Sequence, residues 1–254
     1  MHENHEIAGR SLDTLLLPGA AELPPVVLLH EGLGSIGLWR DLPQRLHALT
    51  RATVLAYSRY GNGFSEVLGA PREPDYMHDE ALRVLPALLD RMGFGRVTLV
   101  GHSDGASIAA IYAGSEPDRV ASLVLAAPHV FVEALSVRSI AAVRESYAHA
   151  LRARMTKHHA DADRTFYGWS DIWLAPSFRD WNIEEYVPRI AAPVLLLQGR
   201  NDEYGTLEQL EAIERRARAP VDRAVLADCG HDPFRERAAT TLALCAAAAQ
   251  AGKK

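Results

Sequence analysis

The stretch Leu99-Val100-Gly101-His102-Ser103-Asp104-Gly105-Ala106 decides the fold of this chain. It has the pattern G-x-S-x-G, and it joins the apolar run 97–100 to an alanine-rich segment that favours helix. This order predicts a sharp turn from a buried strand into a helix, with the hydroxyl of Ser103 exposed at the corner. We expect Gly101 and Gly105 to leave room where a Cβ would collide with the neighbouring strand or helix.

Short apolar runs bounded by glycine, proline or polar residues recur along the chain and alternate with segments that favour helix. The expected strands cover 26–30, 53–57, 97–101, 122–126, 194–198 and 224–227. The expected helices cover 38–49, 77–92, 104–113, 207–217 and 235–249. This alternation is typical of an α/β fold, with a mostly parallel sheet covered by helices on both faces. Residues 12–17 predict a further strand at the edge of that sheet.

The interval 129–189 breaks this rhythm. It contains no clear strand, only a helical segment over 133–159 and then an aromatic-rich run that includes Trp169, Trp173 and Trp181. We therefore predict a core formed by residues 1–128 and 190–254, with 129–189 inserted as a helical cap. The three tryptophans either wall a binding pocket or form the core of the cap.

Composition limits the classes of protein to consider. A chain of 254 residues with 48% hydrophobic content suffices for one large domain. The net charge of -5 predicts neither a nucleic-acid partner nor association with an anionic membrane. Cys229 and Cys245 lack metal-ligand spacing, so we expect no metal and no cofactor. The leucine run 15–17 is cut off by Pro18 and no signal peptide is evident, so we expect a cytoplasmic location.

A serine hydroxyl is a poor nucleophile at neutral pH, so it needs a base, and that base needs an orienting group. The strand expected over 194–198 is followed by a glycine and then Asp202. The strand expected over 224–227 is followed by a glycine and His231. Because the carboxyl ends of parallel strands meet at one edge of a sheet, we expect Ser103, Asp202 and His231 to lie together.

These motifs resemble those of the α/β-hydrolase superfamily, and the matches extend over nearly the whole chain. In that family a His-Gly strand end near the N-terminus carries an oxyanion donor. The matching segment here, 28–35, reads Leu-Leu-His-Glu-Gly-Leu-Gly-Ser, with Glu31 inside the usual His-Gly pair. The resemblance implies an oxyanion hole made by the backbone N–H of Asp104 and that of either Gly32 or Leu33.

The segment 58–65, Ser-Arg-Tyr-Gly-Asn-Gly-Phe-Ser, resembles the family's Asp-x-Arg-Gly-x-Gly-x-Ser loop. Ser58 stands where the family has aspartate. The resemblance implies a structural role for this loop. A phosphate cradle is not expected, because the glycine spacing does not match a nucleotide-binding motif.

The resemblance implies a cofactor-free serine hydrolase that cleaves a carboxylic ester, or a lactone or thioester, through an acyl-enzyme. Ser103 would attack, His231 would carry the proton, and Asp202 would orient His231. One alternative is hydrolysis of a carbon-carbon bond in a vinylogous diketone, as in the ring-cleavage hydrolases that this layout also resembles. Another is a non-catalytic ligand-binding module on the same fold. We expect a small-molecule substrate that is small and apolar or aromatic.

Glu31 and His129 each fit both a functional and a structural interpretation. Glu31 is a candidate pocket carboxylate or a solvated loop residue, and His129 is a candidate pocket residue or a neutral structural histidine. We expect His102 to pack or hydrogen-bond locally. His159 belongs to an expected solvated face of the cap. Asp228 is the next candidate acid should Asp202 not fill that role.

Overall fold

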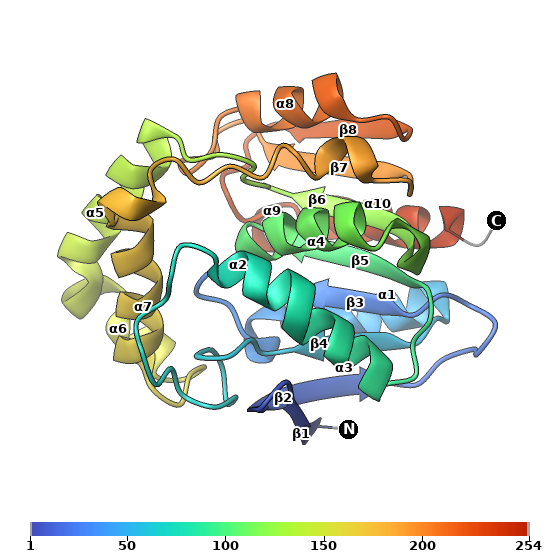
Figure 1. The fold of residues 1–254 in the computed structure, drawn as a ribbon, viewed down its shortest axis with the longest axis horizontal. Helices are drawn as coiled ribbons and strands as arrows, with labels where there is room; N and C mark the ends of the chain where they lie inside the picture. The colour runs from blue at the N-terminus through green and yellow to red at the C-terminus, as the bar shows by residue number, and fades with distance from the viewer. Residues whose placement is uncertain (1, 253–254) are drawn as a thin grey trace.

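The computed structural model describes residues 2–252 and has one eight-stranded sheet in the order β1-β2-β4-β3-β5-β6-β7-β8 (Figure 1). The first pair, β1 with β2, and the pair β2 with β4 are antiparallel, and all other neighbours are parallel. The strands are β1 (His2–Ile7), β2 (Arg10–Leu17), β3 (Val26–Leu29), β4 (Val54–Tyr57), β5 (Val97–His102), β6 (Val120–Ala126), β7 (Val194–Gly199) and β8 (Val221–Leu226). The predicted α/β-hydrolase architecture is confirmed.

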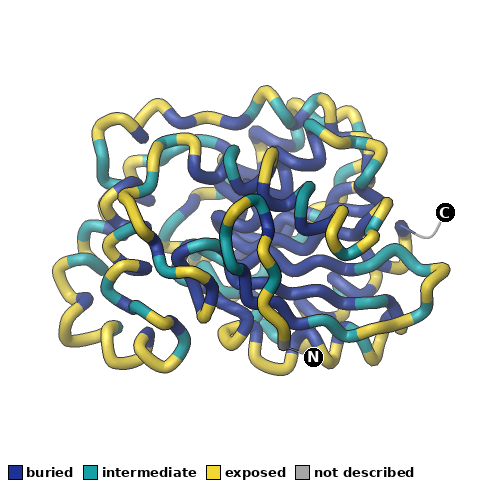
Figure 2. The backbone as a smooth tube through the Cα atoms, turned by 60° about the horizontal axis from the view of Figure 1, so that its bottom comes forward, coloured by how far each residue is buried: buried dark blue, intermediate teal, exposed yellow. Residues whose placement is uncertain are grey.

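Helices cover both faces of the sheet and bury two separate apolar cores. Within β5, Leu99 belongs to one core and Val100 to the other, because successive side chains of a strand point to opposite faces. The first face carries α2 (Tyr76–Asp79), α3 (Leu85–Arg91), α4 (Asp104–Ser115) and α8 (Glu208–Arg216). The opposite face carries α1 (Leu42–Thr50) and α10 (Ala238–Ala251), which follows the short α9 (Pro233–Glu236). Figure 2 shows the buried chain concentrated in the strands between these layers.

Three helices lie between β6 and β7 in the chain: α5 (Ala134–Ala150), α6 (Arg152–Met155) and α7 (Ala162–Leu174). They gather beyond one end of the sheet, the end to which the arrows of the parallel strands point (Figure 1). That end is where the turn after β5 emerges. The division into a core and a cap at 129–189 stays a prediction. No helix within residues 2–252 is long and apolar enough to cross a membrane.

The strand predicted over 12–17 is confirmed as part of β2, but its predicted place at the edge of the sheet was wrong. The edge is β1, and β2 lies between β1 and β4. The two strands form a hairpin whose turn residues Ala8 and Gly9 both have positive φ, as a two-residue hairpin turn requires. The sequence of β1, His-Glu-Asn-His-Glu-Ile, is polar and carries no apolar pattern, as suits a strand at the edge of a sheet.

Candidate active site

Ser103 occupies a strained turn between β5 and α4. Its φ of 53° and ψ of -118° lie in a region that non-glycine residues rarely adopt. The amide N–H of Ser103 donates to the Ala126 carbonyl at 2.9 Å and so anchors the turn to β6. A Cβ at Gly101 would collide with the main chain of α4, and one at Gly105 would collide with the main chain of Leu29. The spatial reason for both glycines is therefore confirmed.

A chain of hydrogen bonds joins three side chains from the ends of different strands. His231 Nε2 lies 2.9 Å from Ser103 Oγ, and His231 Nδ1 lies 2.8 Å from Asp202 Oδ1. With Nδ1 protonated toward the carboxylate, Nε2 is free to accept the serine proton. The structure thus brings together the three residues that the sequence analysis placed at this edge.

The Asp202 carboxylate is held by more than the imidazole. It accepts backbone N–H bonds from Tyr204 at 2.8 Å and Gly205 at 3.1 Å. Burial alone would raise the pKa of Asp202, but His231 and the Tyr204 amide hold it below its ordinary value. The alternative acid, Asp228, has a side chain that is 90% exposed and lies 3.5 Å from Arg237. Asp202 therefore remains a carboxylate at neutral pH and is the acid that contacts His231.

A cavity of about 280 Å³ opens above Ser103 and His231. The predicted residues on its wall are Glu31, Gly32, Leu33, Asp104, His129, Trp169 and Trp173. Residues on the wall that the sequence analysis missed include Ser136, Ile140, Leu151 and Tyr204. Trp181 was expected on this wall, but it lies outside the cavity. Its ring stacks on Phe178 at 5.3 Å, so it packs in the apolar layer beneath.

The predicted oxyanion hole lies where α4 begins and β3 ends. Asp104 is the first residue of α4, and the first N–H groups of a helix have no acceptor within that helix. A Cβ at Gly32 would collide with the indole of Trp169, so this loop and α7 are in close contact. Both Gly32 and Leu33 face the cavity. Either backbone N–H can therefore be the second donor.

A buried ion pair supports the first turn of α4. Arg59 Nη2 lies 3.6 Å from Asp104 Oδ2, and each side chain is 2% exposed. The hydroxyl of Tyr76 donates to the same carboxylate oxygen at 2.7 Å and accepts from Trp173 Nε1 at 3.1 Å. Arg59 also donates to the Glu31 carbonyl at 2.8 Å, which links the 58–65 loop to the end of β3. The ion pair of Arg59 with Asp104 is one structural contact of the 58–65 loop. No sequence pattern pointed to Tyr76.

His102 makes contacts that are not local in the sequence, contrary to our expectation. Its Nε2 lies 2.8 Å from the His231 carbonyl, and its Nδ1 lies 3.7 Å from Glu31 Oε2. Burial disfavours the charged imidazole, but the Glu31 carboxylate outweighs it and raises the pKa of His102 to about 9. Burial likewise opposes ionisation of Glu31, yet His102 lowers the pKa of Glu31 to about 2. The two side chains form an ion pair at neutral pH.

Two other histidines are neutral. His129 lies on the cavity wall, its ring 5.2 Å from that of Trp173, and burial lowers its pKa to about 4. The expected solvated position of His159 was wrong. This residue is 3% exposed, its Nδ1 accepts the Gly63 N–H at 2.9 Å, and burial lowers its pKa to about 4. It connects the loop before α7 to the 58–65 loop.

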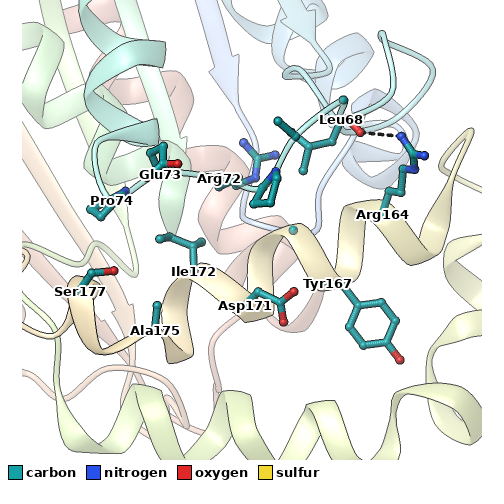
Figure 3. A pocket seen from close by; sticks show the side chains of 14 residues that line it. Leu68, Arg72, Glu73, Pro74, Arg164, Tyr167, Asp171, Ile172, Ala175 and Ser177 are labelled. Carbon is teal, nitrogen blue, oxygen red and sulfur yellow. Dashed lines mark hydrogen bonds between the residues drawn. The ribbon is translucent and has the colours of Figure 1, made fainter.

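A larger hollow of about 470 Å³ lies on the other side of α7, against the loop around Pro71 (Figure 3). Arg164 donates to the Leu68 carbonyl at 3.0 Å across one end of it. Its wall includes neither Ser103 nor His231, so volume alone does not identify the candidate site. Within residues 2–252, no group of three or more His, Cys, Asp or Glu side chains is arranged to hold a metal ion.

The chain is similar to known proteins in sequence and in fold. Residues 24–167 match the family model for the alpha/beta hydrolase fold. The chain belongs to this family. Lipase LipV of Mycobacterium tuberculosis is 29% identical over 194 residues, which cover 75% of this chain and 64% of the lipase. The human (Lyso)-N-acylphosphatidylethanolamine lipase is 32% identical over 114 residues, which cover 45% of this chain.

The chain spans only 33% of the length of that human lipase. Among solved structures, the proline iminopeptidase of Mycobacterium smegmatis superposes with a TM-score of 0.76 at 18% identity. That superposition covers 100% of this chain and 99% of the peptidase. At this identity the likeness establishes the shared fold alone.

Proposed function

We propose that this hydrolase-family protein cleaves a carboxylic ester, or a related lactone or thioester, through an acyl-enzyme on Ser103. The observation that carries the proposal is the hydrogen-bonded series from Ser103 through His231 to Asp202 at the floor of a cavity. A serine nucleophile needs this combination of base and orienting carboxylate.

In the first half-reaction, Ser103 Oγ attacks the acyl carbonyl carbon while His231 Nε2 takes the serine proton. The negative oxygen of the tetrahedral intermediate is stabilised by the Asp104 N–H and by that of Gly32 or Leu33. The carbon–oxygen or carbon–sulfur bond to the leaving group then breaks, and His231 gives its proton to the departing atom. Asp202 holds Nδ1 protonated throughout.

In the second half-reaction, His231 takes a proton from a water molecule, and the resulting hydroxide attacks the acyl carbon. The bond to Ser103 Oγ breaks, His231 returns the proton to the serine, and a carboxylic acid is released. The strained φ of Ser103 keeps Oγ exposed for both attacks. Water and substrate are the only reactants.

We propose that residues 129–189 form a cap that shapes the acyl site. Ile140, Trp169 and Trp173 from this segment line the cavity, and its volume is about 280 Å³. These apolar side chains favour a small acyl group that is apolar or aromatic. The cavity wall also carries many polar side chains, among them neutral His129 and Ser136.

The test is titration with a serine-directed fluorophosphonate, followed by a panel of short-chain esters, lactones, thioesters and a vinylogous diketone. We expect one equivalent of phosphonate on Ser103, loss of turnover on labelling, and carboxylic acid products from the acyl compounds. Cleavage of the diketone alone would assign carbon-carbon bond hydrolysis instead. Ligand binding without labelling or turnover would assign a binding module.

A further inference from the structure

A second hollow of about 490 Å³ adjoins the cavity above Ser103. The two spaces share five lining residues: Glu31, Leu33, Leu151, Asp232 and Arg235. We call this second space the outer groove. It runs between the segment that enters α1, the helix α6 and the start of α10. A substrate bound at Ser103 therefore has room to extend beyond the acyl site.

The outer groove borders the segment that follows the candidate base. Asp232 and Arg235, which border both spaces, lie one and four residues after His231 in the chain. In the proposed mechanism His231 gives its proton to the departing oxygen or sulfur, so that atom lies beside His231. The part of the substrate attached to that atom then continues toward the groove.

The lining of the outer groove is apolar near its base. Trp39 and Phe234 pack edge to face there, with ring centroids 4.9 Å apart. Leu38, Leu42 and Met155 also border the space, and Leu38 is 37% exposed. Such a lining suits an alkyl spacer between the bond that breaks and a more distant group.

The charged residues of the groove are unevenly paired. Each acid on its wall has a basic neighbour: Glu31 lies 3.7 Å from His102, Asp41 lies 3.7 Å from Arg45, and Asp232 lies 3.9 Å from Arg235.

Three further cations on the wall, Arg40, Arg154 and Lys157, are exposed and form no ion pair with any residue in 2–252. The protein as a whole carries a net charge of -5. The groove is therefore a local positive region on an acidic protein.

We propose that the outer groove binds a phosphate group carried by the alcohol or thiol that leaves during hydrolysis. The inference deepens the proposed function and rests on it. Two guanidinium groups and one ammonium group match the charge and the several acceptor oxygens of a phosphate monoester. The apolar base accommodates the spacer between the phosphate and the ester or thioester bond.

The first test compares butyrate esters of ω-hydroxyalkyl phosphates of increasing length with the monobutyrates of the matching diols. We expect the phosphate to raise kcat/KM about tenfold at low ionic strength, once the spacer is long enough to reach Arg154 and Lys157. High salt should abolish the preference, because exposed charges are screened.

The variant Arg154→Gln/Lys157→Gln should lose the preference and still hydrolyse the diol esters at the wild-type rate. Arg218→Gln removes an exposed cation that lies outside both cavities and forms no ion pair with any residue in 2–252, and it should change kcat/KM for neither the phosphate nor the diol esters. Equal kcat/KM for phosphate and diol esters at every length would overturn the proposal. A preference that survives in the double variant would overturn it as well.

The second test does not depend on turnover. The affinity of the Ser103→Ala variant for ligands is measured by calorimetry. We expect the free ω-hydroxyalkyl phosphate to bind at least about tenfold more tightly than the diol. Adding Arg154→Gln/Lys157→Gln to the Ser103→Ala variant should remove this difference in affinity. Equal binding of phosphate and diol would refute the groove site even where Ser103 is labelled by phosphonate. Phosphate binding with no labelling of Ser103 would refute the proposed hydrolase function instead.

Discussion

His102 Nε2 lies 2.8 Å from the backbone carbonyl oxygen of His231. The other ring nitrogen of His102 faces the Glu31 carboxylate at 3.7 Å. A doubly protonated His102 donates to the His231 carbonyl and forms an ion pair with Glu31, so the residue beside the nucleophile connects the loop that carries His231 to the end of β3. This contact links His102 to the backbone of the candidate base.

We predict that His102→Gln lowers the free energy of unfolding by a pH-dependent amount. The pKa of His102 is raised to about 9 in the folded protein, so its contribution is complete below its ordinary pKa of 6.5 and is lost as pH rises through 9. The pKa of Glu31 is lowered to about 2, so the contribution of Glu31 is complete above 4.5 and is lost as pH falls through 2.

The difference in unfolding free energy between wild type and His102→Gln should therefore be greatest between pH 4.5 and 6.5. We expect about 1 to 3 kcal/mol there, decreasing steadily toward pH 9. Urea titrations of both proteins across this range measure it, and taking the difference cancels the effect of the other buried histidines. A difference that is constant from pH 6 to 9 would show that the ion pair adds nothing.

Ser103→Ala and His231→Ala should each remove nearly all turnover, because both side chains act in forming and resolving the acyl-enzyme. Neither change should unfold the protein, since the glycines and the bond to Ala126 hold the turn. Single-turnover assays and circular dichroism check the two expectations. A variant with a tenth of wild-type activity or more would remove that residue from the proposed mechanism.

Asp202→Asn should be severely impaired, because an amide in place of the carboxylate favours the wrong imidazole tautomer. We expect a decrease in kcat of about 10³-fold or more, with the amide still able to receive the Tyr204 N–H through its oxygen. Asp228→Asn is the matched control and should be close to wild type, since its side chain is exposed and lies against Arg237. The reverse ranking of the two variants would transfer the acid role to Asp228.

Arg59→Met should cost about 3 to 5 kcal/mol of stability, because it leaves the buried Asp104 carboxylate without its cation. Combining it with Asp104→Asn should recover part of that loss, giving a coupling energy of about 0.5 to 3 kcal/mol in a double-mutant cycle. The exposed pair of Arg83 with Asp79 is the control, and Arg83→Met should cost less than about 1 kcal/mol. Additive single effects would mean that the buried pair does not couple.

The local part of the site could be predicted from the sequence because each element is encoded by neighbouring residues. The glycines around Ser103 specify a tight turn, and Asp202 and His231 each follow a short apolar run that favours a strand. The run before Asp202 is the buried strand β7, whereas the run before His231 belongs to the partly exposed edge strand β8. Parallel pairing then places the three strand ends at the same edge of the sheet. No long-range information beyond the topology is needed for that step.

The supporting contacts could not be predicted in the same way. Arg59, Tyr76 and Asp104 come from three separate segments, and no periodicity relates them. The tryptophans do carry a signal: Trp169 and Trp173 are four residues apart on α7 and so share one helix face, whereas Trp181 follows the end of that helix. Helical spacing therefore separates the two wall residues from the one that packs beneath.

Variants of Trp169 and Trp181 test whether the tryptophans form the wall of the acyl site. Trp169→Leu removes a wall residue and should change the ranking of ester substrates by kcat/KM, with each lost apolar contact worth about 1 to 3 kcal/mol. A minimal acetyl ester should change little, because its acyl group does not reach that wall.

Trp181→Leu removes the buried tryptophan that lies outside the cavity and should lower thermal stability while leaving the ranking intact. Kinetics on a series from acetyl to phenylacetyl esters, with melting temperatures for both variants, separate specificity from stability. If Trp169→Leu lowers kcat/KM for all esters by one common factor and also lowers the melting temperature, Trp169 is a core residue. The apolar acyl preference would then need another origin.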